Sequence, residues 1–102
     1  MTAAGDTTPP RLSLVVPAYN EESRIAAALG RIAGYLLTLP VRAELIVVDD
    51  GSAEPGRRAV NAAVAELPDD LASQVIRHEF NRGKGAAVRT GMLAARGDYV
   101  GF

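Results

Sequence analysis

The sequence contains no cysteine among its 102 residues, which excludes a disulfide scaffold, an iron–sulfur site and a thiolate zinc site. It also lacks a long hydrophobic run. The longest apolar stretch, residues 25–39, is interrupted by Arg31 and is shorter than the about 20 residues of a membrane-spanning helix. Twelve acidic residues balance eleven basic ones, so there is no basic stripe and no nucleic-acid partner is expected. With 48% hydrophobic and 23% charged residues, the composition indicates one soluble globular domain.

Four short apolar segments predict β-strands. They cover residues 12–16, 44–48, 74–77 and 98–102. Nearly continuous hydrophobicity is typical of strands that are buried on both faces, as in a parallel sheet. The first ten residues are rich in Thr, Ala and Pro, and we expect them to be a disordered leader before a domain at residues 11–102.

Between these segments the apolar residues recur with the period of an amphipathic helix. The spacing predicts one helix over residues 21–39, with Asn20 as its N-cap. A second helix should start near Pro55 and stop before Pro68, and a third should cover residues 85–96. The positions expected to face the core are Ile25, Leu29, Ile32, Leu36, Val60, Val64, Leu67, Val88, Met92 and Ala95.

The order β-α-β-α-β-α-β predicts an α/β, Rossmann-like fold with a parallel sheet and right-handed crossovers. In open sheets of this kind, ligands bind beyond the carboxyl ends of the strands. The loops at residues 17–22, 49–52 and 81–85 should lie together at that edge, and all three are polar. A functional site is therefore expected there.

The second of these loops begins with two adjacent acids, Asp49 and Asp50, followed by Gly51 and Ser52. A carboxylate at a strand end can accept a hydrogen bond from a ribose hydroxyl or from a base N–H group. Asp and Gly are also common turn formers, and Asp50 could cap the following helix. The motif by itself leaves both interpretations open.

The third loop combines cations with glycine in the run Arg82-Gly83-Lys84-Gly85. Glycine allows backbone N–H groups to converge on an anion, and a helix start adds a favourable dipole. This favours a diphosphate, although a glycine turn with solvated cations would look the same. The spacing matches neither a Walker A loop nor the dinucleotide fingerprint.

Other polar residues carry weaker signals. Tyr19 could stack on a base and Glu21 could accept a hydrogen bond, but each by itself is better explained as a surface tyrosine or a glutamate at a helix start. The single histidine, His78, has no metal-ligand partner and no Ser or Asp arrangement evident in the sequence, so a structural role is expected. Asp98 is better explained by strand-start polarity than by metal binding.

Three motifs in chain order resemble the signatures of family 2 glycosyltransferases. They are residues 14–22 (LVVPAYNEE), 44–52 (ELIVVDDGS) and 81–91 (NRGKGAAVRTG). The last motif, continued through residues 94–98 (AARGD), is most similar to dolichyl- or polyprenyl-phosphate β-glucosyltransferases within that family. The resemblance covers about residues 12–102.

This resemblance implies the N-terminal half of a GT-A fold. It implies transfer of a sugar to a polyprenyl or dolichyl phosphate with inversion. The sugar that it favours most is glucose, donated by UDP-glucose. Asp49 would contact the base, Arg82 and Lys84 would lie near the diphosphate, and no catalytic residue is assigned. The residues that the resemblance places around the nucleotide are Pro17, Ala18, Tyr19, Glu21, Asp49, Asp50, Arg82, Lys84 and Gly85.

In this family a divalent metal, Mg or Mn, is expected on an Asp-x-Asp motif that follows the fourth strand. The sequence ends at Phe102 without that motif, so we expect no metal ligands in this chain and no turnover by it. The alternative is a non-catalytic nucleotide-binding module. A dehydrogenase is disfavoured because Pro17 and its neighbours stand where its glycines should be. We expect a cytoplasmic protein, peripheral at the membrane where a lipid acceptor lies.

Overall fold

The computed structural model describes residues 8–102, which form alternating strands and helices. The leader expected at residues 1–10 falls mostly on residues 1–7, which lie outside the described residues. In chain order the elements are β1 (Leu12–Ala18), α1 (Ile25–Leu36), β2 (Ala43–Asp50), α2 (Glu54–Ala65), β3 (Ala72–His78), α3 (Lys84–Ala94) and β4 (Tyr99–Gly101). Across residues 8–102, no helix has both the length and the apolar character needed to cross a membrane.

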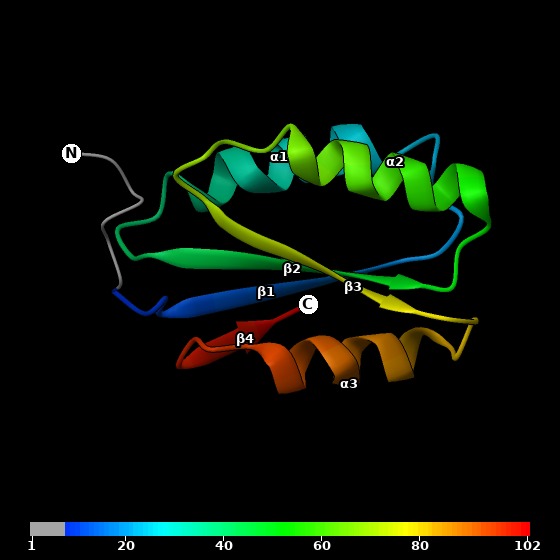
Figure 1. The fold of residues 1–102 in the computed structure, drawn as a ribbon. Helices are drawn as coiled ribbons and strands as arrows, with labels where there is room; N and C mark the ends of the chain where they lie inside the picture. The colour runs from blue at the N-terminus through cyan, green and yellow to red at the C-terminus, as the bar shows by residue number, and fades with distance from the viewer. Residues whose placement is uncertain (1–7) are drawn as a thin grey trace.

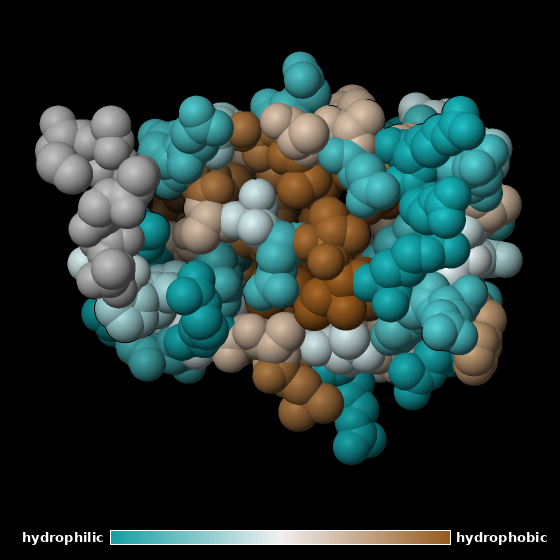
Figure 2. Space-filling view, viewed as in Figure 1, coloured by the Kyte–Doolittle hydropathy of each residue, from teal (hydrophilic) through white to brown (hydrophobic). Residues whose placement is uncertain are grey.

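The four strands form one parallel sheet in the order β3-β2-β1-β4. In Figure 1, α1 and α2 lie on one face of this sheet and α3 lies on the other. All the strands point the same way, and β1, β2 and β3 end toward the right-hand side of that view, whereas the short β4 ends near its middle. The predicted α/β, Rossmann-like parallel fold is therefore confirmed. Figure 2 shows hydrophilic residues over that end and apolar residues in a band between the helix layers.

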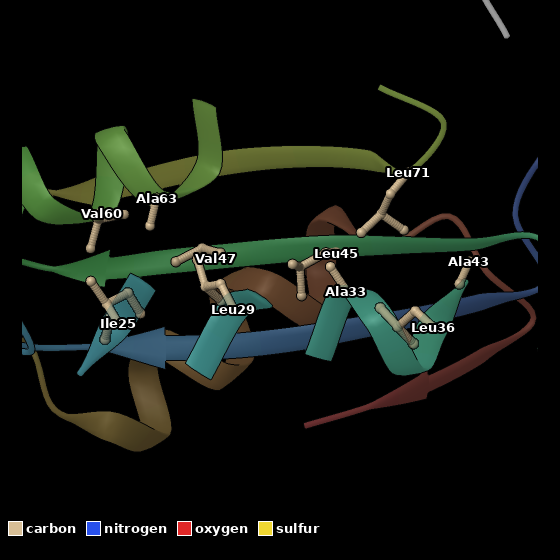
Figure 3. Packing of buried hydrophobic residues seen from close by; sticks show 11 residues of the cluster. Ile25, Leu29, Ala33, Leu36, Ala43, Leu45, Val47, Val60, Ala63 and Leu71 are labelled. Carbon is tan, nitrogen blue, oxygen red and sulfur yellow. The ribbon is translucent and has the colours of Figure 1, made fainter. Parts of the chain in front are cut away.

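The central strand β2 supplies the core because all eight of its residues are buried. Side chains alternate along a strand, so one set faces α1 and α2 while the other set faces α3. Leu45 and Val47 belong to the larger cluster beneath α1 and α2, whereas Ile46 and Val48 belong to the cluster beneath α3. Figure 3 shows the larger cluster, to which α1 and α2 contribute Ile25, Leu29, Ala33, Leu36, Val60 and Ala63.

Helix α1 is shorter than predicted, because it starts at Ile25 and ends at Leu36. Asn20 was expected to cap it, and that expectation is wrong. Asn20 has a positive φ of 50°, and its side-chain oxygen accepts a hydrogen bond from the backbone N–H of Ala53 at 2.9 Å. Its own backbone N–H donates to the hydroxyl of Ser52 at 2.9 Å. Asn20 therefore joins two loops instead of starting a helix.

Helix α3 packs through a different face from the one predicted. Ala87 and Gly91 are its buried residues, whereas Met92, expected to point inward, is 44% exposed. A Cβ atom placed on Gly91 would lie 2.3 Å from Cγ1 of Val15, so the helix backbone rests directly on β1. The hydropathy pattern missed this face because glycine and alanine add little to an apolar period.

Candidate functional site

The three polar loops do meet at the carboxyl edge of the sheet, where they surround an open cleft of about 710 Å³. Parallel pairing of β1, β2 and β3 brings the loops together, since each follows the end of its strand. The residues that line the cleft are Pro17, Ala18, Tyr19, Glu21, Asp50, Asn81, Gly83, Lys84 and Phe102.

Asp50 organises the glycine-rich turn that follows β3. It is 2% exposed, and its two carboxylate oxygens accept hydrogen bonds from the backbone N–H groups of Arg82 and Gly83, both at 2.9 Å. The side-chain amide of Asn81 donates to the same carboxylate at 3.1 Å. The N–H groups of Arg82 and Gly83 are thus already occupied by the carboxylate of Asp50.

The pKa of Asp50 lies below its ordinary value. Burial alone would raise it, but the hydrogen bond from His78 and those from the backbone of Arg82 and Gly83 outweigh that effect. The carboxylate therefore stays ionised, and it acts as a hydrogen-bond acceptor within the loop.

Asp49 lies on the opposite face of the sheet from Asp50 because successive strand residues alternate. It is 1% exposed and accepts a hydrogen bond from the backbone N–H of Ser52 at 3.0 Å. Its other oxygen lies 2.8 Å from the guanidinium of Arg77, which also donates to the backbone carbonyl of Ser52 at 3.1 Å. Sequence reasoning missed Arg77 because the residue was counted only as part of a strand.

Gly51 lets the loops after β2 and β3 approach each other. It has a φ of +74°, and a Cβ atom there would lie 2.3 Å from the backbone carbonyl carbon of Phe80. A side chain is excluded by both the conformation and the space. Together with the contacts of Asn20 to Ser52 and Ala53, this close approach joins all three loops into one hydrogen-bonded unit.

The start of α3 borders the cleft and brings a cation, Lys84, to it. Gly83 has a φ of +98°, and α3 then begins at Lys84, with no side chain of residues 8–102 capping it. The first N–H groups of a helix have no partner within the helix, and they carry partial positive charge. Lys84 and this helix start can therefore receive an anionic group that enters the cleft.

The structure brings together most, but not all, of the residues expected at a nucleotide. Pro17, Ala18, Tyr19, Glu21, Asp50 and Lys84 line the cleft. Arg82 and Gly85 instead border a neighbouring hollow on the outer side of α3, and Asp49 is enclosed by its protein partners. Asn81, Gly83 and Phe102 were not among the expected site residues, although Asn81 and Gly83 stand inside the quoted motif.

His78 has the partners that the sequence did not reveal. Its Nδ1 lies 2.8 Å from Oδ1 of Asp50, and its Nε2 lies 2.8 Å from the hydroxyl of Thr90. The expectation that His78 has no Ser or Asp arrangement is wrong for the acid, because Asp50 lies beside the ring, and the hydroxyl partner is Thr90. The sequence did not reveal these partners because they are 28 and 12 residues away. The ring is 6% exposed, which agrees with the expected structural setting.

The residues of the cleft do not fit a divalent metal. Within residues 8–102, no group of three or more His, Cys, Asp or Glu side chains is placed to hold one. Both oxygens of Asp49 and both oxygens of Asp50 already accept hydrogen bonds or an ion pair from the protein. Neither carboxylate is available as a ligand without breaking those contacts.

A parallel α/β sheet with a polar cleft at its carboxyl edge is an architecture of nucleotide-binding proteins. Comparison with known families makes the assignment specific. Residues 13–102 match the model of glycosyl transferase family 2, and the chain belongs to that family.

Several curated relatives share substantial identity with this chain. It is 40% identical over 89 residues to the dodecaprenyl-phosphate galacturonate synthase of Rhizobium johnstonii, covering 87% of this chain and 26% of that protein. It is 42% identical over 93 residues to the dolichyl-phosphate beta-glucosyltransferase of Drosophila melanogaster, covering 84% and 28%. The human protein of that name is 35% identical over 100 residues, covering 93% and 31%. The chain thus spans about 26–31% of the length of these relatives.

A solved structure supports the same assignment. The mannosyltransferase PcManGT of Pyrobaculum calidifontis, in complex with GDP-Man and Mn²⁺, matches with a TM-score of 0.69 and 30% identity. The match covers 87% of this chain and 25% of that one. The fold of residues 8–102 is therefore that of part of a GT-A glycosyltransferase.

Proposed function

We propose that this chain forms the nucleotide-binding part of an enzyme that transfers a sugar from a nucleoside diphosphate donor to a polyprenyl phosphate. The observation that carries the proposal is the cleft, in which Lys84 and the uncapped start of α3 face the loops after β1 and β2. The names of the relatives share a polyprenyl or dolichyl phosphate but differ in the sugar. The lipid acceptor is therefore better supported than the sugar, and it would place the reaction at a membrane surface.

For the donor we propose UDP-glucose, because several relatives are named as dolichyl-phosphate beta-glucosyltransferases. Tyr19 is 49% exposed on the cleft and offers its ring to a base. Asp49 and Arg77 form an ion pair at the ends of β2 and β3, and a base or ribose would reach Asp49 if that pair opens. Lys84 would contact the diphosphate from within the cleft, and Arg82 and Gly85 would lie near it from the neighbouring hollow.

The transfer itself requires little proton chemistry. An oxygen of the acceptor phosphate would form a bond to C1 of the sugar while the bond from C1 to the donor diphosphate breaks. The configuration at C1 inverts, and the nucleoside diphosphate leaves with the electron pair. A phosphate is already anionic near neutral pH, so no strong general base is needed. Lys84 would stabilise the charge that develops on the leaving diphosphate.

The proposal is tested by calorimetric titration with UDP, uridine and GDP. Lys84→Ala should weaken UDP by roughly tenfold or more while leaving uridine unchanged, because only UDP carries the charged group that Lys84 contacts. Asp49→Asn should weaken both ligands if Asp49 contacts the base. Arg31→Ala removes an exposed cation from α1 and serves as the matched control. Absence of UDP and GDP binding, or equal losses for UDP and uridine in Lys84→Ala, would contradict the proposal.

A module that binds nucleotide without turnover is the second candidate. It is favoured by the contacts of Asp49 and Asp50, because both carboxylates already bind protein groups, whereas the mannosyltransferase neighbour holds Mn²⁺ together with its donor. Calorimetry with and without Mn²⁺ or Mg²⁺ separates the two candidates. UDP affinity that rises with the cation supports a transferase site, and UDP affinity that ignores the cation supports the module.

A further inference from the structure

The ring of His78 connects the end of β2 to the middle of α3. His78 and Asp50 are register partners at the ends of β3 and β2, and both side chains face α3. From there Nδ1 meets Asp50 at 2.8 Å and Nε2 meets Thr90 of α3 at 2.8 Å. The ring is thus one link in a chain that runs from carboxylate to imidazole to hydroxyl, buried at Asp50 and partly buried at Thr90.

The partners of the ring define where its proton lies. Asp50 is ionised and can only accept hydrogen bonds, so Nδ1 must donate. In the neutral ring Nε2 is then an acceptor, and the hydroxyl of Thr90 donates to it. In that arrangement each of the three groups has a hydrogen-bond partner.

The same chain reaches helix α3 at two places. Through Asp50 it holds the backbone N–H groups of Arg82 and Gly83, which form the turn just before the helix starts. Through Thr90 it holds the helix about two turns further on. Two attachment points restrict both rotation and sliding of α3, so they define where Lys84 and the first helical N–H groups stand at the cleft.

We propose that His78 and Thr90 are positioning residues for the diphosphate of the bound nucleotide, acting through Asp50 and α3 to place Lys84 and the helix start. This inference rests on the proposed function, because it assumes that a nucleoside diphosphate occupies the cleft. Neither residue touches the ligand, so loss of either should affect the phosphate contacts and spare those of the base and ribose.

The test measures UDP and uridine affinity by calorimetry in His78→Phe, His78→Asn and Thr90→Val. His78→Phe and Thr90→Val should each weaken UDP by about tenfold and leave uridine within twofold. His78→Asn should recover part of the loss, because its amide N–H can take the place of Nδ1–H beside Asp50. Thr38→Val removes a hydroxyl that bonds to the carbonyl of Tyr35 away from the cleft, and it should change neither ligand. In the wild-type chain, the ring nitrogen NMR signals of His78 should report the Nδ1–H tautomer.

The outcomes separate this inference from the proposed function. Wild-type chain that binds neither UDP nor GDP overturns the proposed function and, with it, this inference. Wild-type chain that binds UDP, with variants that lose UDP and uridine equally or lose neither, overturns the inference alone. Thermal melts accompany each titration. If His78→Phe does not fold, Thr90→Val and His78→Asn, whose side chains fit the same space, decide the matter by the same comparison.

Discussion

At the scale of single residues, the two neighbouring aspartates at the end of β2 do different things. Asp49 faces α1 and α2 and holds Ser52 and Arg77, whereas Asp50 faces α3 and holds the turn before that helix. The alternation of a strand separates two like charges that would otherwise repel. Each carboxylate then stabilises a different loop of the cleft.

Gly51 gives a prediction at this scale. Gly51→Ala should lower the free energy of unfolding by at least about 2 kcal/mol, because the residue has a positive φ and its new Cβ would meet the backbone of Phe80 at 2.3 Å. Gly30→Ala in α1 is the control: among the described residues nothing lies within 4 Å of its Cβ, so it should stabilise by about 0.5–1 kcal/mol. Urea unfolding measures both changes, and similar effects at the two glycines would refute the account of Gly51.

At the scale of the elements, α3 is the helix whose packing depends on a missing side chain. Gly91→Ala should destabilise the fold by about 1–3 kcal/mol, because the added methyl would lie 2.3 Å from Val15, a stiff residue on the buried strand β1. Val15→Ala removes the atoms that clash. The double variant should therefore be more stable than the sum of the two single losses predicts.

The double-mutant cycle supplies the check for this prediction. A coupling energy near zero between positions 91 and 15 would mean that α3 does not rest on Val15. Gly34→Ala, on the open surface of α1, is the matched control because its Cβ meets nothing within 4 Å in the described part of the chain.

At the scale of the whole molecule, buried carboxylates hold α3 at both ends of the sheet. Asp50 stands at the carboxyl end of β2, and Glu44, 2% exposed, stands near its start. Glu44 accepts hydrogen bonds from the hydroxyl of Ser13 at 2.6 Å and from the backbone N–H of Arg96 at 2.8 Å. Burial alone would raise the pKa of Glu44, but these bonds and the charge of Arg96 lower it below its ordinary value.

The two lowered pKa values predict how stability depends on pH. Asp50 and Glu44 bind protons more readily in the unfolded chain, so their contribution is fully present above the unfolded pKa values of about 3.9 and 4.3. It is lost as the pH falls through the folded values. The urea midpoint should fall steeply below about pH 4, and Asp50→Asn with Glu44→Gln should reduce that decline. An equal decline in the wild type and the double variant would exclude these groups as its cause.

Much of the fold could be predicted from local pattern. Apolar segments of strand length and helical periods between them identified every element and the parallel sheet, because burial on both faces leaves a clear signature in the sequence. The bounds and N-cap of α1 and the packing face of α3 were predicted wrongly, whereas α2 starts and ends close to the predicted positions. Asn20 is recruited by Ser52 and Ala53, more than 30 residues away, and α3 packs through Ala87 and Gly91, residues with no hydropathy to detect.

The sequence likewise predicted one part of the candidate site and missed another. Motifs in the sequence located the three loops and most of the residues that line the cleft, including Tyr19, Glu21 and Lys84. They did not show that Asp49 and Asp50 are engaged by the protein itself, nor that Arg77 joins them. The nucleotide contacts of these residues therefore stay predictions.

The sequence by itself determined the order of elements, the parallel sheet, the family and the edge at which the site lies. The order of elements, the parallel sheet and the edge follow from hydropathy and spacing along the chain, whereas the family follows from the resemblance of three motifs and the match to the family model. Only the tertiary structure decided which polar groups meet. The chain from Asp50 through His78 to Thr90 joins β2, β3 and α3, and its members stand 28 and 12 residues apart in sequence. Such contacts depend on strand register and helix placement, because a shift of one residue would turn each side chain to the other face of the sheet.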